Sequence, residues 1–458
     1  MKITLEDIFS IPTAVIYNPD LYKSVTSVST DTRTIKKNSL FVAVKGKNFD
    51  GHNYINEAIK KGASAIVANR KKISELDFVD LPIISVKNTI TAYGELAKIW
   101  RNKISGKVIS ITGSNGKTST KEMIAHLLST KYKVHKTILN NNNNIGVPLT
   151  ILTSPKDADF IVLEHGTNHF GEIEYTAKIA QPDYSLITNI GSSHLKYLES
   201  VEKVFEEKVK LFDYTKASGN IFINGEDKFL RSRIKNSKNS ITYGSNSKLD
   251  VNYQILGISV DSKYKIKIEG LNKSLTFTIP LLGKSNIQNL VSAISIVLKL
   301  GLSKKDILNS VKTLKSVKGR LSKFDFNKYT LIDDTYNANP ESVKNALEVL
   351  SNFKKRKNKI LVLGDMFELG ENAKQIHINL AQNIEKAKVN ILITIGKNTK
   401  YLNEAIKLSS ITRYHFNNRK KMNVFFEDLR LNDSVILVKG SRGMHMEEFV
   451  ETIKRNHA

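Results

Sequence analysis

The apolar positions near the N-terminus follow the spacings that are typical of short strands and helices. Residues 39–46 (SLFVAVKG) form an apolar run that ends at glycine, which predicts a buried strand. Residues 52–63 predict a helix stopped by Gly62, and residues 64–70 (SAIVANR) predict the next strand. We therefore expect residues 1–85 to form a small α/β domain.

From residue 107 onward, apolar strands alternate with amphipathic helices. The strand predictions are KVISITG, DFIVLEHG and DYSLITNIG, with STKEMIAHLLSTKY as a helix, and this order is typical of a parallel sheet covered by helices. A more polar, strand-rich section runs from about residue 220 to 280, and a helix ending at Gly301 closes the region. We predict a central P-loop ATPase-like domain over residues 86–318.

A third alternating region begins near residue 329 (YTLIDDTYNANP). Its further strand predictions are KILVLGD, NILITIG and SVILVKG, separated by helices. We predict a C-terminal Rossmann-like α/β domain over residues 319–458, so that the chain has three α/β domains.

Composition narrows the functional classes. No apolar run approaches the roughly 18 residues of a membrane span, and Glu6 and Asp7 interrupt the region where a secretory signal would be apolar. The chain has no cysteine, so disulfides, thiolate metal sites and cysteine nucleophiles are excluded, and a cytoplasmic location fits. The net charge is +26, but the lysines are spread over every region without interleaved aromatic residues, so we expect no nucleic-acid partner.

The stretch SITGSNGKTSTKEM (residues 110–123) lies between a predicted strand and a predicted helix. A strict Walker A loop would have a glycine where this chain has Ile111. Gly113 and Gly116 permit a tight turn, Lys117 can reach the β- and γ-phosphates, and the hydroxyl of Thr118 is placed for Mg²⁺. The strand before and the helix after the loop predict a nucleotide phosphate site.

Two metal-binding residue types follow the next predicted strands. Glu164 ends the strand FIVLE, and His194 follows the strand ending in LITNIG. Ligands of open α/β sheets bind at the carboxyl ends of the strands, and phosphoryl transfer needs metal ions to neutralise charge. The two residues are therefore predicted metal ligands.

At this point the motifs resemble a known family, the Mur ligases. TGSNGKTST resembles their shortened ATP loop, which explains the missing glycine. STDTRTIKKNSLFVAVKGKNFDGHNYI resembles the uridine-nucleotide module, NNNNNIGVPLTIL the central substrate loop, and LEHGTNHFGEI the metal-bearing strand end. DDTYNANPES, VLGDMFELG and VKGSRGMHME resemble the C-terminal domain.

The resemblance implies an ATP-dependent amide ligase of peptidoglycan synthesis. The motifs resemble most the type that joins D-alanyl-D-alanine to UDP-N-acetylmuramoyl-tripeptide, through phosphorylation of the tripeptide carboxylate and attack of the dipeptide amine on the acyl phosphate. Another Mur-type or folylpolyglutamate-type ligase is the alternative, although the D-N-P-R motif of the type that adds the third residue is absent. A nucleic-acid-binding GTPase switch or motor would need an N-K-x-D motif, which is also absent. We expect a monomer.

The resemblance also assigns roles to residues. The expected ATP ligands are Gly113, Ser114, Asn115, Gly116, Lys117, Thr118, Ser119, Asn286, Asn289, Arg320 and Asp334. The expected ligands of two Mg²⁺ ions are Thr118, Glu164, His194 and Lys208, and the expected catalytic residues are Lys117, His194 and Lys208. The expected contacts to the UDP-linked substrate are Thr32, Arg33, Lys45, Gly46, Asp50, His52, Asn142 and Asn143, with Lys47 nearby, and those to the dipeptide are Asn337 and Asn339.

Two positions depart from the family pattern. Lys208 matches a lysine that the family carbamylates, but Val209 replaces the following glycine and Lys210 the next acid, so Lys210 competes for the same role. Ser285 stands where the adenine motif usually has histidine. Carbamylation needs a neutral amine, which burial among charges favours.

Overall fold

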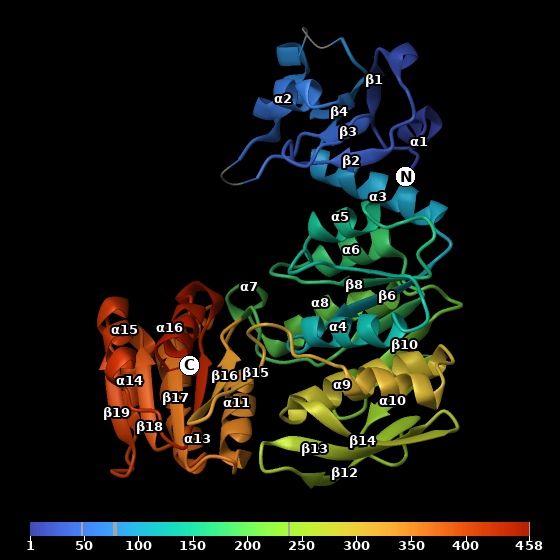
Figure 1. Ribbon diagram of the computed structural model, residues 1–458. Coiled ribbons are helices and arrows are strands. Elements are labelled where there is room, and N and C mark those ends of the chain that lie inside the picture. Colours follow the sequence, from blue (N-terminus) through green and yellow to red (C-terminus); the bar gives the residue numbers. More distant parts are fainter. Residues whose placement is uncertain (47–48, 77–79, 237–238, 458) are drawn as a thin grey trace. The chain divides into compact units, whose positions relative to one another are not determined.

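The computed structural model describes residues 1–46, 49–76, 80–236 and 239–457. Within these residues the strands form three sheets, and helices flank them (Figure 1). The chain packs as two compact units. Unit 1 contains residues 1–111, 131–185 and 210–220, and unit 2 contains residues 112–130, 186–209 and 221–458.

The first sheet has five strands in the order β1-β5-β4-β3-β2, and β1 is antiparallel to β5 while the other neighbours are parallel. Its strands are β1 (Val15–Tyr17), β2 (Ser27–Ser29), β3 (Ser39–Val42), β4 (Ala63–Asn69) and β5 (Ile83–Val86). The helices of this region are α1 (Leu5–Phe9), α2 (Ile55–Lys60) and α3 (Thr89–Lys103). The predicted strands and helix are confirmed, and α2 ends just before Gly62, whose φ of 108° suits glycine.

The α3 helix joins the first sheet to the helices that follow it in unit 1. Its buried Trp100 and Leu96 share one apolar core with Val42 and Ile84 of the sheet and with Ile151 of α5. The Trp100 indole donates to the Ser154 carbonyl (3.2 Å), so the large ring is both packed and hydrogen-bonded.

The second sheet has nine strands in the order β14-β13-β12-β11-β10-β9-β6-β8-β7. They are β6 (Lys107–Thr112), β7 (Val134–Lys136), β8 (Phe160–Glu164), β9 (Tyr184–Ile187), β10 (Asn220–Asn224), β11 (Ser240–Gly244), β12 (Val251–Ile258), β13 (Lys263–Gly270) and β14 (Lys273–Leu282). The pairs β7–β8, β6–β8, β10–β11 and β11–β12 are parallel, whereas β12, β13 and β14 form an antiparallel meander.

The helices of this region are α4 (Lys117–Leu128), α5 (Gly146–Leu152), α6 (Glu172–Ala180), α7 (Leu195–Leu198), α8 (Val201–Asp213), α9 (Lys284–Lys299) and α10 (Lys304–Lys312). In unit 2, α4 packs against α9 and α10. The α9 helix is followed by Gly301, whose φ of 83° confirms the predicted glycine at its end.

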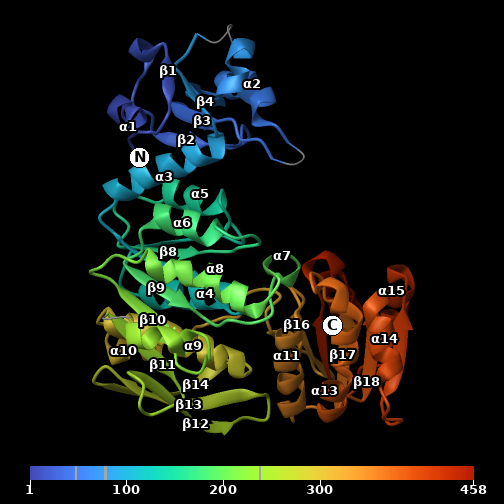
Figure 2. The ribbon, with the colours of Figure 1, turned by 180° about the vertical axis from the view of Figure 1, so that it is seen from behind.

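The third sheet has six strands in the order β15-β16-β20-β17-β18-β19, all parallel except the β15–β16 pair. They are β15 (Ser322–Asp325), β16 (Tyr329–Asp334), β17 (Asn358–Gly364), β18 (Ile391–Ile395), β19 (Thr412–Phe416) and β20 (Ser434–Lys439). The helices are α11 (Pro340–Asn352), α12 (Ala373–Ile378), α13 (Ala381–Lys386), α14 (Lys397–Ala405), α15 (Arg419–Asp428) and α16 (Glu447–His457). Two apolar cores, one with α11, α13 and α14 and one with α15 and α16, cover this sheet with helices on both faces (Figure 2).

Short 3₁₀ helices complete the described elements: η1 (Pro19–Leu21), η2 (Gly51–Tyr54), η3 (Arg70–Leu76), η4 (Leu230–Asn236), η5 (Gly370–Asn372) and η6 (Arg442–Met444). Among the described residues, no helix has the length and apolar character needed to cross a membrane. The domain boundaries predicted after residues 85 and 318 stay predictions.

The parallel strands bring distant loops together. Because β16, β20 and β17 are neighbours and parallel, the segments after Asp334, Lys439 and Gly364 leave the sheet at the same edge. Most of the predicted C-terminal motif residues lie in these three segments.

Candidate active site

The predicted phosphate loop connects β6 to α4 with two glycines in conformations that other residues rarely adopt. Gly113 has a φ of 146° and Gly116 a φ of 84°. A side chain at Gly113 would collide with the Thr188 hydroxyl, and one at Gly116 would collide with the Asn289 amide. The loop therefore requires glycine at both positions for conformation and for space.

The segment after β9 holds the phosphate loop in place. The backbone N–H groups of Ser114 and Asn115 donate to the backbone and side-chain oxygens of Asn189 (both 2.9 Å). The Thr188 hydroxyl donates to the Asn115 carbonyl (2.5 Å), and the Ser114 hydroxyl exchanges hydrogen bonds with the backbone of Gly191 (3.0 and 2.9 Å). The loop is therefore organised by the protein itself, as a preformed anion site requires.

Lys117, Thr118 and Ser119 form the first turn of α4, where the helix N-terminus favours an anion. Lys117 Nζ donates to the carbonyls of Gly113 (2.6 Å) and Ser114 (3.3 Å), so its ammonium lies within the loop. This position is compatible with the predicted contact to phosphate.

Lys208 lies on α8 in the same unit and is 1% exposed. Burial, and secondarily the positive charge of Lys117, hold the pKa of Lys208 well below its usual range, although Glu207 acts in the opposite direction. Its rival Lys210 has a side chain that is 47% exposed and lies 3.8 Å from Asp213. The neutral amine that carbamylation needs is thus favoured at Lys208, whereas carbamylation itself stays a prediction.

Glu164 ends β8 in unit 1 and is 2% exposed. Its backbone N–H donates to the Thr137 hydroxyl (3.0 Å), and its Oε1 accepts from Asn142 Nδ2 (2.9 Å). The Asn142 amide thus holds the predicted metal carboxylate, and the predicted contact of Asn142 to the substrate stays a prediction. Asn143 Oδ1 accepts from the backbone of residues 145 and 146 (3.1 and 2.8 Å), which fixes the start of α5.

His165 follows Glu164 and was not predicted to have a role. Its two ring nitrogens lie 2.9 Å from the hydroxyls of Ser110 and Thr176, and burial lowers its pKa to about 3. The imidazole is therefore neutral at physiological pH and anchors the strand end that carries Glu164.

His194 precedes α7 with a φ of 54°, a conformation that is uncommon outside glycine. Its Nδ1 lies 3.1 Å from Oε2 of Glu368, an ion-pair distance without hydrogen-bond geometry. Glu368 follows β17 with a φ of 61° and was not singled out from the sequence, although it lies in the motif VLGDMFELG.

The four predicted metal ligands are divided between the units, since Glu164 belongs to unit 1 and Thr118, His194 and Lys208 belong to unit 2. Within the described part of the chain, no three His, Cys, Asp or Glu residues cluster as a metal site would. The predicted set contains only two residues of these types and stays a prediction.

The two asparagines predicted to bind adenine lie buried at the start of α9. Asn286 Nδ2 donates to the Leu282 carbonyl (2.8 Å), and the side chain of Asn289 packs against Gly116. Asn289 thus lies beside the phosphate loop, and its predicted contact to the base stays a prediction.

Arg320 reaches the phosphate loop from the first residues of the predicted C-terminal domain. Its Nη2 donates to the Thr118 hydroxyl (3.0 Å), and its guanidinium lies over the ring of Tyr336 (4.0 Å). The backbone N–H of Tyr336 donates to the carbonyl of Gly319 (3.0 Å), which draws these two segments together. No local sequence pattern indicates that Tyr336 supports Arg320.

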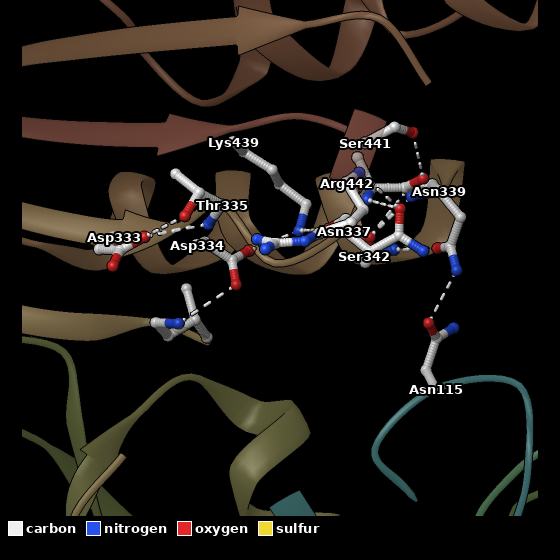
Figure 3. Close-up of polar contacts among 12 residues, drawn as sticks. Asn115, Asp333, Asp334, Thr335, Asn337, Asn339, Ser342, Lys439, Ser441 and Arg442 are labelled. Carbon is white, nitrogen blue, oxygen red and sulfur yellow. Dashed lines mark hydrogen bonds and ion pairs between the residues drawn. The ribbon is translucent and has the colours of Figure 1, made fainter. Parts of the chain in front are cut away.

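Asp334 ends β16 and forms a buried ion pair with Lys439 at the end of β20. Lys439 Nζ lies 2.6 Å from Asp334 Oδ2 and 3.0 Å from the Asn337 carbonyl (Figure 3). Asp334 Oδ1 accepts from the backbone N–H of Leu321 (3.1 Å). Burial raises the pKa of Asp334, and Lys439 opposes this shift.

The two predicted dipeptide contacts lie in the segment after β16 (Figure 3). Asn337 Oδ1 accepts from the backbone N–H groups of Ala338 (2.9 Å) and Arg442 (3.3 Å). Asn339 caps α11, since its Oδ1 accepts from the Ser342 N–H (2.8 Å). Ser441 joins the segments after β20 and β17, because its Oγ accepts from the Phe367 N–H (2.8 Å).

The predicted uridine-nucleotide residues of the first domain lie after β2, after β3 and at η2. Thr32 donates to Glu57 (3.0 Å), and the exposed Arg33 pairs with Asp31 (2.6 Å). Gly46 N–H donates to the Phe49 carbonyl (2.8 Å), while Lys47 lies outside the described residues.

Asp50 and His52 have structural partners of their own. Asp50 Oδ1 lies 2.6 Å from His52 Nδ1, and His52 Nε2 accepts from the backbone N–H of Asn69 (2.9 Å). The side chain of Lys45 is 73% exposed and lies 3.7 Å from Asp50. Of these three, Lys45 is the one most available to an anionic ligand, and all remain predictions as substrate contacts.

The chain matches three family models in order along its length. They are described as Mur ligase family, catalytic domain (residues 24–101), Mur ligase middle domain (residues 111–297) and Mur ligase, glutamate ligase domain (residues 319–442). The UDP-N-acetylmuramoyl-tripeptide–D-alanyl-D-alanine ligase of Bacillus subtilis (strain 168) is 34% identical over 457 residues, which cover 99% of this chain and 98% of that protein. This chain belongs to the Mur ligase family. The ligase of the same name from Escherichia coli (strain K12) is 32% identical over 461 residues, covering 100% and 99%.

Solved structures agree with this membership. A crystal structure of MurF from Acinetobacter baumannii superposes with a TM-score of 0.90 at 26% identity and covers 99% of both chains. The MurF ligase from Thermotoga maritima in complex with ADP gives a TM-score of 0.84 at 28% identity, covering 94% of this chain and 98% of that one. The predicted three-domain α/β fold and the resemblance to Mur ligases are thereby confirmed.

Proposed function

We propose that this Mur ligase joins D-alanyl-D-alanine to UDP-N-acetylmuramoyl-tripeptide at the expense of ATP, giving the pentapeptide precursor of peptidoglycan. The observation that carries the proposal is similarity over the full length, at 34% identity and 99% coverage, to a ligase named for this reaction. A chain that shared only the nucleotide-binding domain would support ATP binding and no more.

The phosphate loop is the proposed seat of ATP. The two positive-φ glycines, the first turn of α4 and Lys117 supply the backbone donors and the cation that a triphosphate needs. Arg320 approaches from the C-terminal segment and donates to the Thr118 hydroxyl, and Asp334 accepts from the backbone of the adjacent Leu321. A Mur ligase solved with ADP supports the same ligand class here.

We propose that magnesium and a modified lysine complete the site. Thr118, Glu164, His194 and a carbamylated Lys208 would offer oxygen and nitrogen ligands, and the ions would neutralise charge on the phosphates. The low pKa of Lys208 supports this assignment, because the neutral amine reacts with carbon dioxide to give an anionic carbamate.

The reaction needs activation because a carboxylate has no good leaving group. One oxygen of the tripeptide carboxylate bonds to the γ-phosphorus as the bond to ADP breaks, which gives an acyl phosphate. The amine of the dipeptide then bonds to the acyl carbon, loses a proton, and phosphate leaves as the amide forms. Lys117 would stabilise the charge on the transferring phosphoryl group, and enclosure of the site would keep water from the acyl phosphate.

The segments after β16, β17 and β20 are the proposed place of the dipeptide. Asn337 has an exposed side chain, and Arg442 is exposed beside it, so both are accessible to a zwitterionic ligand. We infer a monomer that acts in the cytoplasm on small molecules, with no nucleic-acid partner.

Other Mur-type ligases are the alternative. Structures of a UDP-N-acetylmuramoyl-L-alanyl-D-glutamate–2,6-diaminopimelate ligase and of MurC from Thermotoga maritima give TM-scores of 0.60 and 0.61 at 16% identity, which speaks for the fold alone. The dipeptide-adding type is favoured because its relatives match at much higher identity.

Phosphate release from ATP by the purified protein tests the proposal. With UDP-N-acetylmuramoyl-tripeptide present, we expect release to depend on D-alanyl-D-alanine, with single D- or L-amino acids giving little stimulation. Equal stimulation by single amino acids would contradict the assignment, and mass spectrometry of the nucleotide product identifies what was added.

A further inference from the structure

Asn115 lies in the middle of the phosphate loop, yet both ends of its side-chain amide contact the start of α11. Its Oδ1 accepts from Asn339 Nδ2 at 2.8 Å (Figure 3). Its Nδ2 donates to Glu341 Oε2 at 3.1 Å. These residues are separated by 224 and 226 positions in the sequence, and all belong to unit 2.

The direction of each hydrogen bond is fixed by its neighbours. Asn339 Oδ1 caps α11 by accepting from the Ser342 N–H, so the nitrogen of the same amide faces Asn115. Asn115 must then present its oxygen to Asn339, which leaves its nitrogen for the Glu341 carboxylate. Donors and acceptors therefore match along the whole chain of contacts.

The backbone of Asn115 is hydrogen-bonded to the segment that follows β9. Its N–H donates to Asn189 Oδ1 (2.9 Å), and its carbonyl accepts from the Thr188 hydroxyl and from Asn189 Nδ2 (3.1 Å). Asn115 thus connects two structures: the β9 segment that shapes the phosphate loop and the helix start that follows Asp334 and Asn337.

We propose that Asn115 is a positioning residue that couples the phosphate loop to segment 334–341, and not a ligand of the nucleotide. The inference rests on the proposed function, because that segment carries the groups assigned to ATP and to the dipeptide. A nucleotide that binds this preformed conformation of the loop would stabilise the contacts of Asn115 to segment 334–341 and so hold that segment in place for the dipeptide, and by linkage the dipeptide would strengthen nucleotide binding by the same factor.

Calorimetric titration with a non-hydrolysable ATP analogue and D-alanyl-D-alanine, in the presence of the UDP-linked substrate, tests the coupling. We expect the analogue to raise dipeptide affinity of the native protein by roughly 10-fold, the scale of one or two hydrogen bonds. Asn115→Ala and Asn339→Ser should each remove most of this enhancement. Serine keeps an oxygen to cap α11 but has no amide to donate, so the helix is retained.

The double variant decides whether the two residues act together. If these hydrogen bonds carry the coupling, Asn115→Ala with Asn339→Ser loses no more than Asn115→Ala alone, which already removes the contacts to Asn339 and Glu341. Independent losses that multiply would overturn the proposal. So would weaker binding of the analogue alone to Asn115→Ala with normal binding to Asn339→Ser, because that pattern marks a nucleotide ligand.

A control and a second measurement separate this inference from the proposed function. Asn379→Ala removes an exposed amide at the end of α12, where it accepts from Gln375 (2.8 Å), and should leave the enhancement intact. Hydrogen exchange of segment 334–341 should slow when the analogue binds the native protein and should not slow in either variant. This readout involves no dipeptide, so it tests the coupling even if phosphate release shows that the amine substrate is a different one.

Discussion

Lys208 in α8 and Lys439 at the end of β20 are both almost fully buried, at 1% and 2% exposure, but their surroundings differ. Lys208 is influenced by a second cation, Lys117, and its pKa is held well below the usual range chiefly by burial. Lys439 lies 2.6 Å from the carboxylate of Asp334. Burial disfavours the charged form of an amine, and a nearby anion favours it. Burial thus favours the neutral amine at Lys208, whereas Asp334 favours the ammonium at Lys439.

The difference suits Lys208 to a chemical role and Lys439 to a structural role. A neutral amine is a nucleophile and can take up carbon dioxide, so the Lys208 site is suited to a reaction. A paired ammonium is unreactive but joins β16 to β20 at the edge where the C-terminal segments emerge. Lys323 is paired like Lys439 but is less buried, because its side chain is 19% exposed and contacts Asp261 (3.0 Å) and Asp325 (2.8 Å).

Lys439→Met should produce the largest loss of stability. It leaves Asp334 buried without its cation, and breaking one partner of a buried ion pair costs about 3–5 kcal/mol. Hydrogen exchange of peptides from β16 and β20 measures the local free energy of opening. Lys400→Met, at an exposed pair 4.0 Å from Glu404, is the matched control and should change little. A loss of opening free energy below about 1 kcal/mol in Lys439→Met would contradict the claim that the pair with Asp334 stabilises the junction of β16 and β20.

Lys208→Ala should instead leave the protein folded and lower its activity. We expect kcat for dipeptide-dependent phosphate release to fall roughly 100-fold, the scale for losing support of a metal site. A short-chain carboxylic acid should restore part of the activity, because it replaces the missing carbamate. Lys210→Ala removes an exposed lysine of the same helix and should stay within about twofold of the native rate. Full activity in Lys208→Ala, or equal losses in both variants, would contradict the assignment.

The sequence predicted those features that depend on neighbouring residues. Strands, helices and the phosphate loop follow from local apolar spacing and from the Gly113–Thr118 motif, and Glu164 was found because it ends an apolar strand. The N-cap role of Asn339 also had a local signal, an asparagine directly before Pro340 at the start of an apolar helix.

Contacts between distant segments could not be predicted in this way. Lys439 and Asp334 are separated by 105 positions, and the strand order β16-β20 places them together. Asn115 and Asn339 are separated by 224 positions and follow strands of different sheets, so no strand order predicts their contact. The same holds for His194 and Glu368, which follow different strands. Residue type alone also did not indicate the structural partners of His52, whose two ring nitrogens both bond within the first domain, while its predicted substrate contact stays a prediction.

Asp261→Asn should give the smallest loss of stability, and it tests the pair with Lys323, which is less buried than the pair of Lys439 with Asp334. Burial raises the pKa of Asp261, but the hydrogen bonds from Ser259, Lys323 and Lys263 outweigh it and lower the pKa well below the usual range. A lowered folded-state pKa contributes stability that is present above the unfolded value of about 4 and is lost as pH falls through the folded value. Asp261 is 17% exposed, so we expect Asp261→Asn to lower the free energy of unfolding by about 1 kcal/mol at pH 7, measured by urea unfolding.

This difference in unfolding free energy between the native protein and the variant should narrow below pH 4. The control Asp157→Asn removes a carboxylate from an exposed pair with Lys133 and should show no measurable difference at either pH. If the difference in unfolding free energy between the native protein and Asp261→Asn widened on acidification, the carboxylate would not be stabilised by its lysines. Pairing would then not stabilise a partly buried carboxylate at this site.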